Sequence, residues 1–418
     1  MPSQRSKMGW VDFSSLERDR VSQVLSILQE KGTLDELGIG QIRDAFADKL
    51  FPDISTIQTR AKYFVTLPYI FHDYRNLPFF DRSKITLYDY LSEREDELAR
   101  QLVKNHKNAI PPGIIGKESL DTGVSRKPSS VYWNGLRQLS IINAQLSLRE
   151  FVVQYQDLLN SKVKEHEEDD EPSSVTAHMA PKPDCYELQW FEDVSLELTR
   201  REAEFLRSRL LNSSKTEFSI LSQVIKHDLE AKVLTTLDNT TNSSWQIEAL
   251  YECLKDTPVS FNTKECLKKA LEFSFVLKGA HIRYNILLAN RSGNAAFKDK
   301  LEDEFVLWIE QARSRQVYFT QENIDSWYQL AFGLSERINN RTRKFIERWC
   351  HLITTHSPTS ELDKCVRAQA IANKGGRCLL NKALNEQQGW VGMFNLEFRW
   401  PTARTILRDI QEGLSAKS

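Results

Sequence analysis

The residues with the clearest capacity for chemistry are the thiols and imidazoles near the C-terminus, since both are zinc ligands in proteins. They are Cys350, His351, His356, Cys365 and Cys378. The short Cys-x-x-Cys type of spacing that forms a structural zinc knuckle is absent from this group. We therefore predict buried thiols and histidines on helix surfaces, and the sequence indicates no metal and no cofactor.

Motifs of the common catalytic sites are absent from the sequence. The chain has no Walker A loop, no G-x-S-x-G, no H-E-x-x-H, and no H-x-E paired with C-x-x-C. Neighbouring carboxylates such as Glu302, Asp303 and Glu304 are common on exposed helices and nominate no general acid or base. We therefore expect a protein that binds rather than catalyses. A divergent metal-dependent nuclease, whose carboxylates follow no recognisable motif, stays an open alternative.

Basic and aromatic residues lie close together in two segments of the N-terminal half. The second of these, R-K-P-S-S-V-Y-W-N-G-L-R, opens a predicted helix. A helix N-terminus offers N–H groups to a phosphate, and nearby side chains add contacts to it. The candidate nucleic-acid-binding residues are Arg60, Lys62, Arg126, Lys127, Trp133 and Arg137. The alternative is that Trp133 is a core residue and that the basic residues are only solvated.

The first pair of cations must be positioned by the stretch from Gly38 to Arg75, which we predict to hold two helices. Apolar residues recur every four positions in its first half, at Ile42, Phe46 and Leu50. Pro52 ends that helix, because the residue before a proline avoids the α conformation. A second helix is predicted from about Thr56, with both cations in its second turn. Two helices so joined form an αα-corner, with a helix-turn-helix or winged-helix-like unit as the alternative.

The second half of the chain is predicted to be almost wholly helical. Its longest helix is expected from Thr263 to about Asn290, where Gly279 on the buried side allows a close contact between helices. Polar residues near the apolar end of this helix need hydrogen-bond partners. They are His281, Arg283, Tyr284 and Asn285. We predict a satisfied internal network, with a functional cleft as the alternative.

These patterns predict an all-α protein. Near the C-terminus Phe394, Leu396 and Phe398 alternate as in a short extended element, and Pro401 opens a last helix. The chain has 418 residues, of which 40% are hydrophobic, and this length favours two domains. We predict a multi-helix N-terminal domain over residues 1–160, an acidic, proline-containing linker over 161–184, and a larger helical C-terminal domain over 185–418.

Charge and cysteine usage limit the classes of function. The formal net charge of −1 excludes a polyanion-binding footprint over the whole surface but permits a local basic patch. The six cysteines are scattered, which is typical of reduced thiols. No signal-peptide pattern and no uninterrupted apolar span is present, so we expect a cytoplasmic protein without membrane contact.

Four phrases of the sequence resemble a bacterial family that is catalogued only as a domain of unknown function. They are Gly9–Phe13, Asp35–Phe64, Lys127–Leu136 and Phe398–Leu414. The resemblance implies genes located beside those of helicase-like proteins and phospholipase-D-type nucleases, in neighbourhoods similar to anti-phage defence loci. It brings no catalytic residue to this chain.

Together these observations lead to one functional hypothesis and two alternatives. We expect a non-catalytic accessory subunit of a bacterial anti-phage defence system, which binds DNA, docks a helicase-like or nuclease partner, or does both. The first alternative is a protein-only adaptor without DNA contact, and the second is the divergent nuclease.

Overall fold

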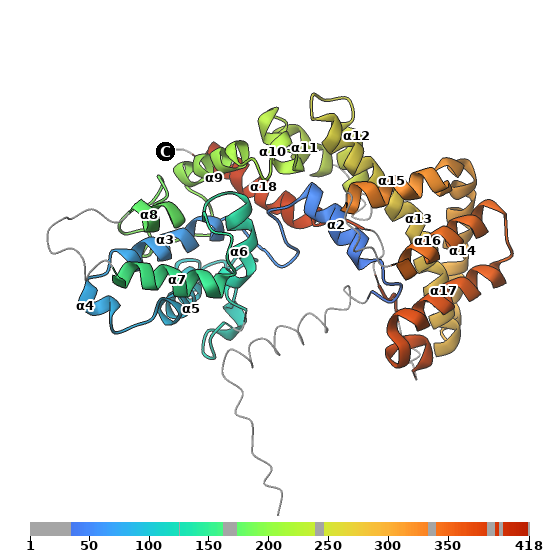
Figure 1. Ribbon diagram of the computed structural model, residues 1–418, viewed down its shortest axis with the longest axis horizontal. Coiled ribbons are helices and arrows are strands. Elements are labelled where there is room, and N and C mark those ends of the chain that lie inside the picture. The colour runs from blue at the N-terminus through green and yellow to red at the C-terminus, as the bar shows by residue number, and fades with distance from the viewer. Residues whose placement is uncertain are drawn as a thin grey trace, which may run out of the picture.

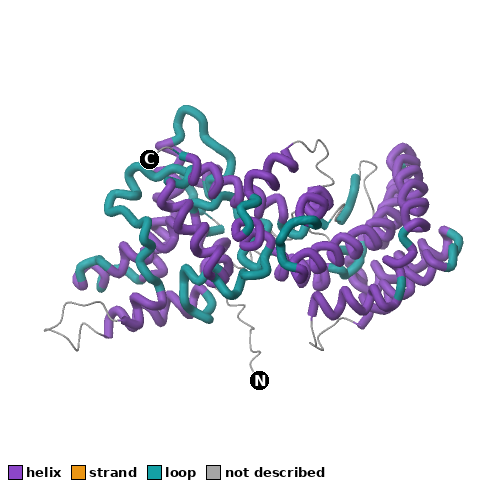
Figure 2. Tube along the Cα trace, turned by 90° about the horizontal axis from the view of Figure 1, so that it is seen from above, coloured by secondary structure: helices purple, strands orange, loops and turns teal. Residues whose placement is uncertain are grey.

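The computed structural model describes residues 35–124, 126–161, 174–238, 246–332, 340–382, 389–392 and 396–416. These residues form seventeen α-helices, a few short 3-10 helices and no strand, which confirms the predicted all-α class (Figure 2). The molecule is elongated, with one group of helices at each end and a smaller group between them (Figure 1). None of the described helices is long and apolar enough to cross a membrane.

One end of the molecule is built from helices of the N-terminal half (Figure 1). Helix α3 lies at its centre, with α5, α6 and α9 packed against it, and α7 packs on α5 and α6. Eleven of the thirteen residues of α3 are buried, which fits this central position. The helices of this end are α3 (Tyr63–Arg75), α4 (Phe79–Arg82), α5 (Leu87–Asn105), α6 (Pro128–Gln138), α7 (Leu148–Ser161), α8 (Ser174–Met179) and α9 (Arg200–Asn212), with η1 (Lys117–Ser119) after α5.

The other end is organised around the longest helix, α13 (Phe261–Ser292), close to its predicted bounds. Gly279 faces the indole of Trp308 on α14, and an added Cβ would lie 2.4 Å from the ring, so the predicted close helix contact is confirmed. The remaining helices here are α14 (Ala295–Ser314), η4 (Gln316–Phe319), α15 (Gln321–Phe332), α16 (Asn340–Thr354), α17 (Thr359–Lys374), η5 (Gly375–Arg377) and η6 (Leu379–Asn381).

Helices from distant parts of the sequence fill the middle (Figure 1). Helix α2 packs against α13 and α15, whereas the last helix, α18, packs against α9 and α11. The buried side chains of the described residues form one continuous hydrophobic core. The helices of this group are α2 (Gly40–Leu50), α10 (Ile220–Lys226), α11 (Glu230–Asp238), α12 (Gln246–Leu254) and α18 (Trp400–Ser415).

The predicted corner after α2 is wrong in its second half. Helix α2 ends at Leu50 beside Pro52 as expected, but α3 begins only at Tyr63, and turns occupy the residues between them. A helix-turn-helix needs a much shorter connection, and a winged helix needs strands that the described residues do not form. These residues stay in turns because side chains from remote helices accept hydrogen bonds from their backbone N–H groups, as described below.

The predicted extended element is also absent from the described residues. Phe394 lies outside them, and Phe398 and Arg399 have positive φ angles of 46° and 70°, which is the geometry of a turn. The last helix follows at Trp400 with Pro401 in its first turn, as predicted.

The acidic run of the predicted linker lies outside the described residues. Helices α7 and α8, which precede and follow it, pack against each other. The domain limits stay a prediction.

Candidate functional site

Arg60, the first candidate cation, lies in the loop before α3 and pairs with Asp409 of α18. Its Nε is 3.0 Å from both carboxylate oxygens and its Nη2 is 2.9 Å from Oδ1. The same carboxylate accepts a hydrogen bond of 2.7 Å from the backbone N–H of Ala61. Burial raises the pKa of Asp409, and the bonds from Arg60 and Ala61 oppose that rise. The guanidinium therefore serves mainly to hold the loop on α18.

Lys62, the second cation, is buried more deeply. Its Nζ lies 2.7 Å from Glu202 Oε2, and both side chains are 6% exposed. Glu202 also completes the capping box of α9 by accepting from the N–H of Thr199, and it accepts from the hydroxyl of Tyr69 at 3.3 Å. A phosphate outside the protein cannot replace this carboxylate without exposing the core.

The remaining candidates lie around α6. Lys127 pairs with Asp96 at 2.6 Å, and Arg126 is partly buried next to it. Trp133 is buried, and its indole N–H donates to the carbonyl of Leu146 at 3.0 Å, which favours its role as a core residue. The fifth basic residue, Arg137, donates to the carbonyl of Ala144 and to Gln145, in the segment that leads to α7.

The placement of Arg60 and Lys62 in a second helical turn is therefore wrong, because both belong to a loop whose partners lie on α18 and α9. The structure uses these two cations for internal ion pairs and Trp133 for the core. It does not gather the six candidates into one exposed cationic surface, and their binding of nucleic acid stays a prediction without geometric support.

Two further residues of this junction, Tyr132 and Asp409, are not among the six candidate site residues. The hydroxyl of Tyr132 accepts from the N–H groups of Thr59 and Arg60, at 2.8 and 3.0 Å, and donates to the carbonyl of Arg60 at 2.8 Å. Asp409 carried a usable signal, because it is the one acidic residue among the buried positions of α18. A carboxylate on such a face requires a cationic partner, although the sequence does not say which one.

The junction also brings together three of the four phrases that carry the family resemblance. Tyr132 of the third phrase packs edge to face on Phe64 of the second, and Trp400 of the fourth packs against Phe51. Arg399 donates to the carbonyls of Phe51 and Ile54. The first phrase, Gly9–Phe13, lies outside the described residues. The shared junction indicates that these phrases specify the fold at this point.

The polar residues of α13 form the predicted internal network. Arg283 pairs with Asp363 on α17 at 2.8 Å and with Glu302 on α14 at 2.7 Å. Their neighbours are also bonded: His281 to the carbonyl of Leu277, Tyr284 to Glu36, and Asn285 to both backbone groups of Val391. The prediction of a satisfied network is confirmed for Arg283, Tyr284 and Asn285, whereas the buried Nε2 of His281 has no hydrogen-bond partner among the described residues.

The cysteine and carboxylate clusters offer little for catalysis. All six cysteines are reduced and buried, as predicted, and burial raises the pKa of Cys365 to about 11. Within the part of the chain that the structure describes, no group of three or more His, Cys, Asp and Glu residues is arranged to hold a metal ion.

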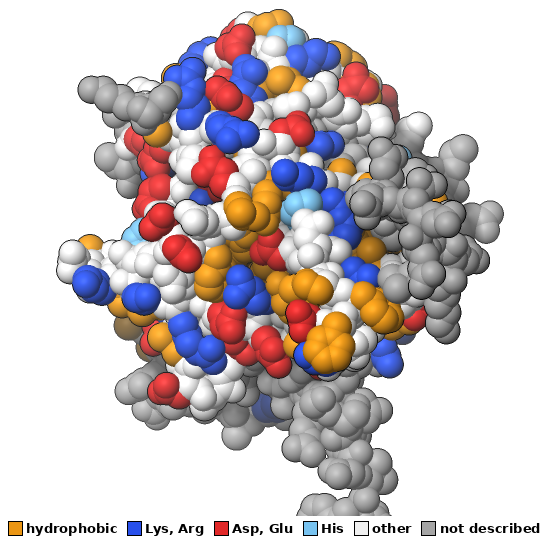
Figure 3. Space-filling model, turned by 90° about the vertical axis from the view of Figure 1, so that its left-hand side faces the viewer, with side chains coloured by type: hydrophobic (Ala, Val, Ile, Leu, Met, Phe, Trp, Pro, Cys, Tyr) orange, Lys and Arg blue, Asp and Glu red, His pale blue; other side chains and the backbone are white. Residues whose placement is uncertain are grey.

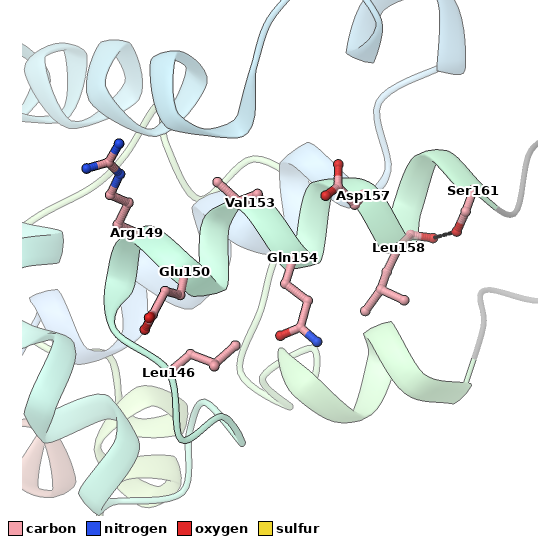
Figure 4. Close-up of a pocket in the computed structure, with 8 residues that line it drawn as sticks. All are labelled: Leu146, Arg149, Glu150, Val153, Gln154, Asp157, Leu158 and Ser161. Carbon is pink, nitrogen blue, oxygen red and sulfur yellow. Dashed lines mark hydrogen bonds between the residues drawn. The ribbon is translucent and has the colours of Figure 1, made fainter.

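A shallow groove of about 600 Å³ follows the outer face of α7, and we call it the α7 groove (Figure 4). Glu150, Gln154 and Leu158 follow the side of the helix that faces α8, and Leu146 points towards the same space (Figure 4). Val153, on the neighbouring side, is 55% exposed. Figure 3, which looks at this end of the molecule, shows hydrophobic side chains gathered among charged ones.

The sequence matches a protein family described as a family of unknown function, DUF6361, over residues 5–413. No curated protein and no solved structure matches the chain.

Proposed function

We propose that this chain, which belongs to the DUF6361 family of unknown function, is a non-catalytic accessory subunit of a bacterial anti-phage defence system. In this role it docks a helicase-like or phospholipase-D-type nuclease partner through the α7 groove. The family resemblance in the sequence supports the defence setting. The geometry favours docking of a protein over contact with DNA, because Arg60 and Lys62 are held in internal ion pairs.

The observation that carries the proposal is that apolar side chains line the α7 groove outside the buried face of the helix. Its inner face buries Phe151, Val152 and Tyr155 in the core. A helix at the surface of a globular protein normally needs only that stripe. The additional apolar side chains of Val153 and Leu158 instead line the outer groove. Exposed apolar surface bordered by polar residues is typical of a protein interaction site.

The side chains that line the α7 groove indicate which kind of partner segment it binds. The apolar side chains of the groove, Leu146, Val153 and Leu158, suit an amphipathic helix, which binds through side chains three, four and seven positions apart. Asp157 and Glu150 line the groove together with Arg149, which leaves one negative charge in excess. A partner helix with lysine or arginine beside its apolar residues is therefore complementary in charge, and this steers association more than it adds affinity.

The test is co-purification with the helicase-like or nuclease protein encoded beside this gene, after exhaustive nuclease treatment. Val153→Asp places a charge in the groove and should abolish co-elution on size exclusion. Val306→Asp on α14 is a matched control, because Val306 is 53% exposed and far from the groove. Retained co-elution of the Val153 variant, or equal loss with the Val306 variant, would exclude the α7 groove as the docking site.

A further inference from the structure

A second groove, of about 670 Å³, runs along the exposed side of α18. We call it the α18 groove. One wall is the stripe of α18 that carries Arg404, Arg408 and Glu412, and the other walls are the loop at Arg60 and the first residue of α12, Gln246. The groove shares no residue with the α7 groove. It therefore needs an explanation of its own.

Two guanidinium groups in the α18 groove converge on a single carboxylate oxygen. Arg404 and Arg408 lie one helical turn apart, and the Nη2 atoms of both donate to Oδ1 of Asp238, the last residue of α11. The side chain of Arg404 is 17% exposed, that of Arg408 is 40% exposed and that of Asp238 is 52% exposed. Arg404 is thus largely covered by the protein, whereas Arg408 and the carboxylate that joins the two arginines are partly in solvent.

The charges of the groove are unevenly distributed along α18. Arg60 is neutralised by Asp409, and the two clamping arginines are balanced by Asp238 and Glu412, so the groove carries no net charge while Asp238 is in place. Glu412 lies two turns beyond Arg404, roughly 12 Å further along the helix axis. Displacement of Asp238 would therefore leave the positive charge of Arg404 and Arg408 in the second and third turns of α18, on the N-terminal side of Glu412.

We propose that Arg404 and Arg408 form a phosphate-binding clamp, and that Asp238 takes the place of the anion in this structure. Guanidinium groups bind phosphate through paired, charge-assisted hydrogen bonds. A phosphate group offers oxygens to both arginines, whereas Asp238 uses one oxygen for both. Arg404 Nε is buried and has no hydrogen-bond acceptor among the described residues, so it is the Nη2 end of this guanidinium that meets the carboxylate. Because Asp238 is half exposed, its ion pairs are weak competitors for an incoming phosphate.

The experiment removes first the charge of Asp238, which competes with the phosphate, and then the two arginines of the clamp. Asp238→Asn keeps the shape of the side chain and eliminates its charge, and the double variant Arg404→Gln, Arg408→Gln eliminates the clamp. The matched control is Arg200→Gln with Arg201→Gln, two arginines of α9 in exposed ion pairs. Circular dichroism and melting curves show whether each variant folds. The single variant Arg408→Gln, at the more exposed position, provides a second measurement if the double variant does not fold.

The probes are inorganic phosphate, followed by calorimetry, and a fluorescein-labelled oligonucleotide, single-stranded or duplex, followed by anisotropy at low salt. We expect Asp238→Asn to bind a phosphate probe about tenfold more tightly than the wild type, which corresponds to about 1.4 kcal/mol. The double variant should lose binding, Arg408→Gln should weaken it, and the control should not change it.

The two probes distinguish the sources of the phosphate. Binding of oligonucleotide alone, with a steep salt dependence, identifies a nucleic-acid backbone as the ligand class. Binding of inorganic phosphate as well identifies a small phosphate-bearing ligand. The clamp is overturned if Asp238→Asn binds no more tightly than the wild type, or if the arginine variants bind equally well. None of these readouts depends on a protein partner, so failure here is distinguishable from failure of docking at α7.

Discussion

The ion pair between Lys62 and Glu202 provides a direct test of whether the N-terminal cations serve the fold or a ligand. The substitution Lys62→Met keeps the length of the side chain and leaves the Glu202 carboxylate buried without its cation. Removing one member of a buried pair costs about 3–5 kcal/mol. The cost should be about 3 kcal/mol, at the lower end of this range, because Glu202 still accepts hydrogen bonds from Thr199 and Tyr69.

The assay is thermal unfolding followed by tryptophan fluorescence and circular dichroism. With an unfolding entropy of about 2.1 cal/mol/K per residue, a loss of 3 kcal/mol lowers the midpoint by about 3 °C if the whole chain unfolds together. The shift is about 7 °C if a unit of about 200 residues unfolds alone. The double variant Lys62→Met, Glu202→Gln should recover part of this loss, since its buried carboxamide needs no cation.

The matched control is Lys84→Met. Lys84 pairs with Asp81 at 3.2 Å, but both side chains are more than half exposed. Exposed pairs contribute about 0–1 kcal/mol, so this variant should melt within about 1 °C of the wild type. The reasoning is refuted if Lys62→Met melts like the control while oligonucleotide binding is lost, because Lys62 would then serve a ligand and not the core.

Two further predictions concern the core. Gly279→Ala should destabilise the protein by about 1–3 kcal/mol, because the new methyl group overlaps the ring of Trp308. The control Gly376→Ala should not destabilise it, because the added methyl group meets nothing within 4 Å. Equal melting temperatures of the two variants would contradict this prediction. Burial raises the pKa of Glu95 to about 8, although bonds from Ser129 oppose the rise, so its contribution to stability is complete below about pH 4.5 and is lost as the pH rises through about 8. Between pH 5 and pH 8.5 the free energy of unfolding of Glu95→Gln should therefore rise relative to that of the wild type, by up to about 1.4 kcal/mol per pH unit while the pH lies between these two pKa values. A difference between the two proteins that does not depend on pH would contradict the assignment.

Local patterns in the sequence were sufficient to predict the helices and some of their close contacts. The bounds of α13, the end of α2 before Pro52 and the tight approach at Gly279 all follow from periodicity, proline geometry and side-chain volume. The late start of α3 at Tyr63 could not be predicted in this way. The loop before it is held by Tyr132 and Asp409, and Asp409 lies 349 positions from Arg60 in the sequence.

The candidate site shows the same limit. The sequence correctly identifies basic and aromatic residues, but their role depends on the charges that the fold places beside them. Arg404 and Arg408, which resemble ordinary residues of a C-terminal helix, have the geometry of an anion clamp because α11 ends beside them. The identity of a side chain can be read locally, whereas its availability depends on contacts between distant helices.

The position of Asp409 has a consequence for the order in which the protein can mature during synthesis. The loop at Arg60 leaves the ribosome long before the carboxylate that holds it, which is translated 349 residues later. At about 5–20 residues per second, the N-terminal helices wait tens of seconds for this partner. A nascent chain that stops before α18 leaves the Arg60 guanidinium and the ring of Phe51 without the groups that cover them. Completion of the N-terminal end is thereby tied to translation as far as α18, and a product that terminates before this helix remains a target for chaperones and proteases.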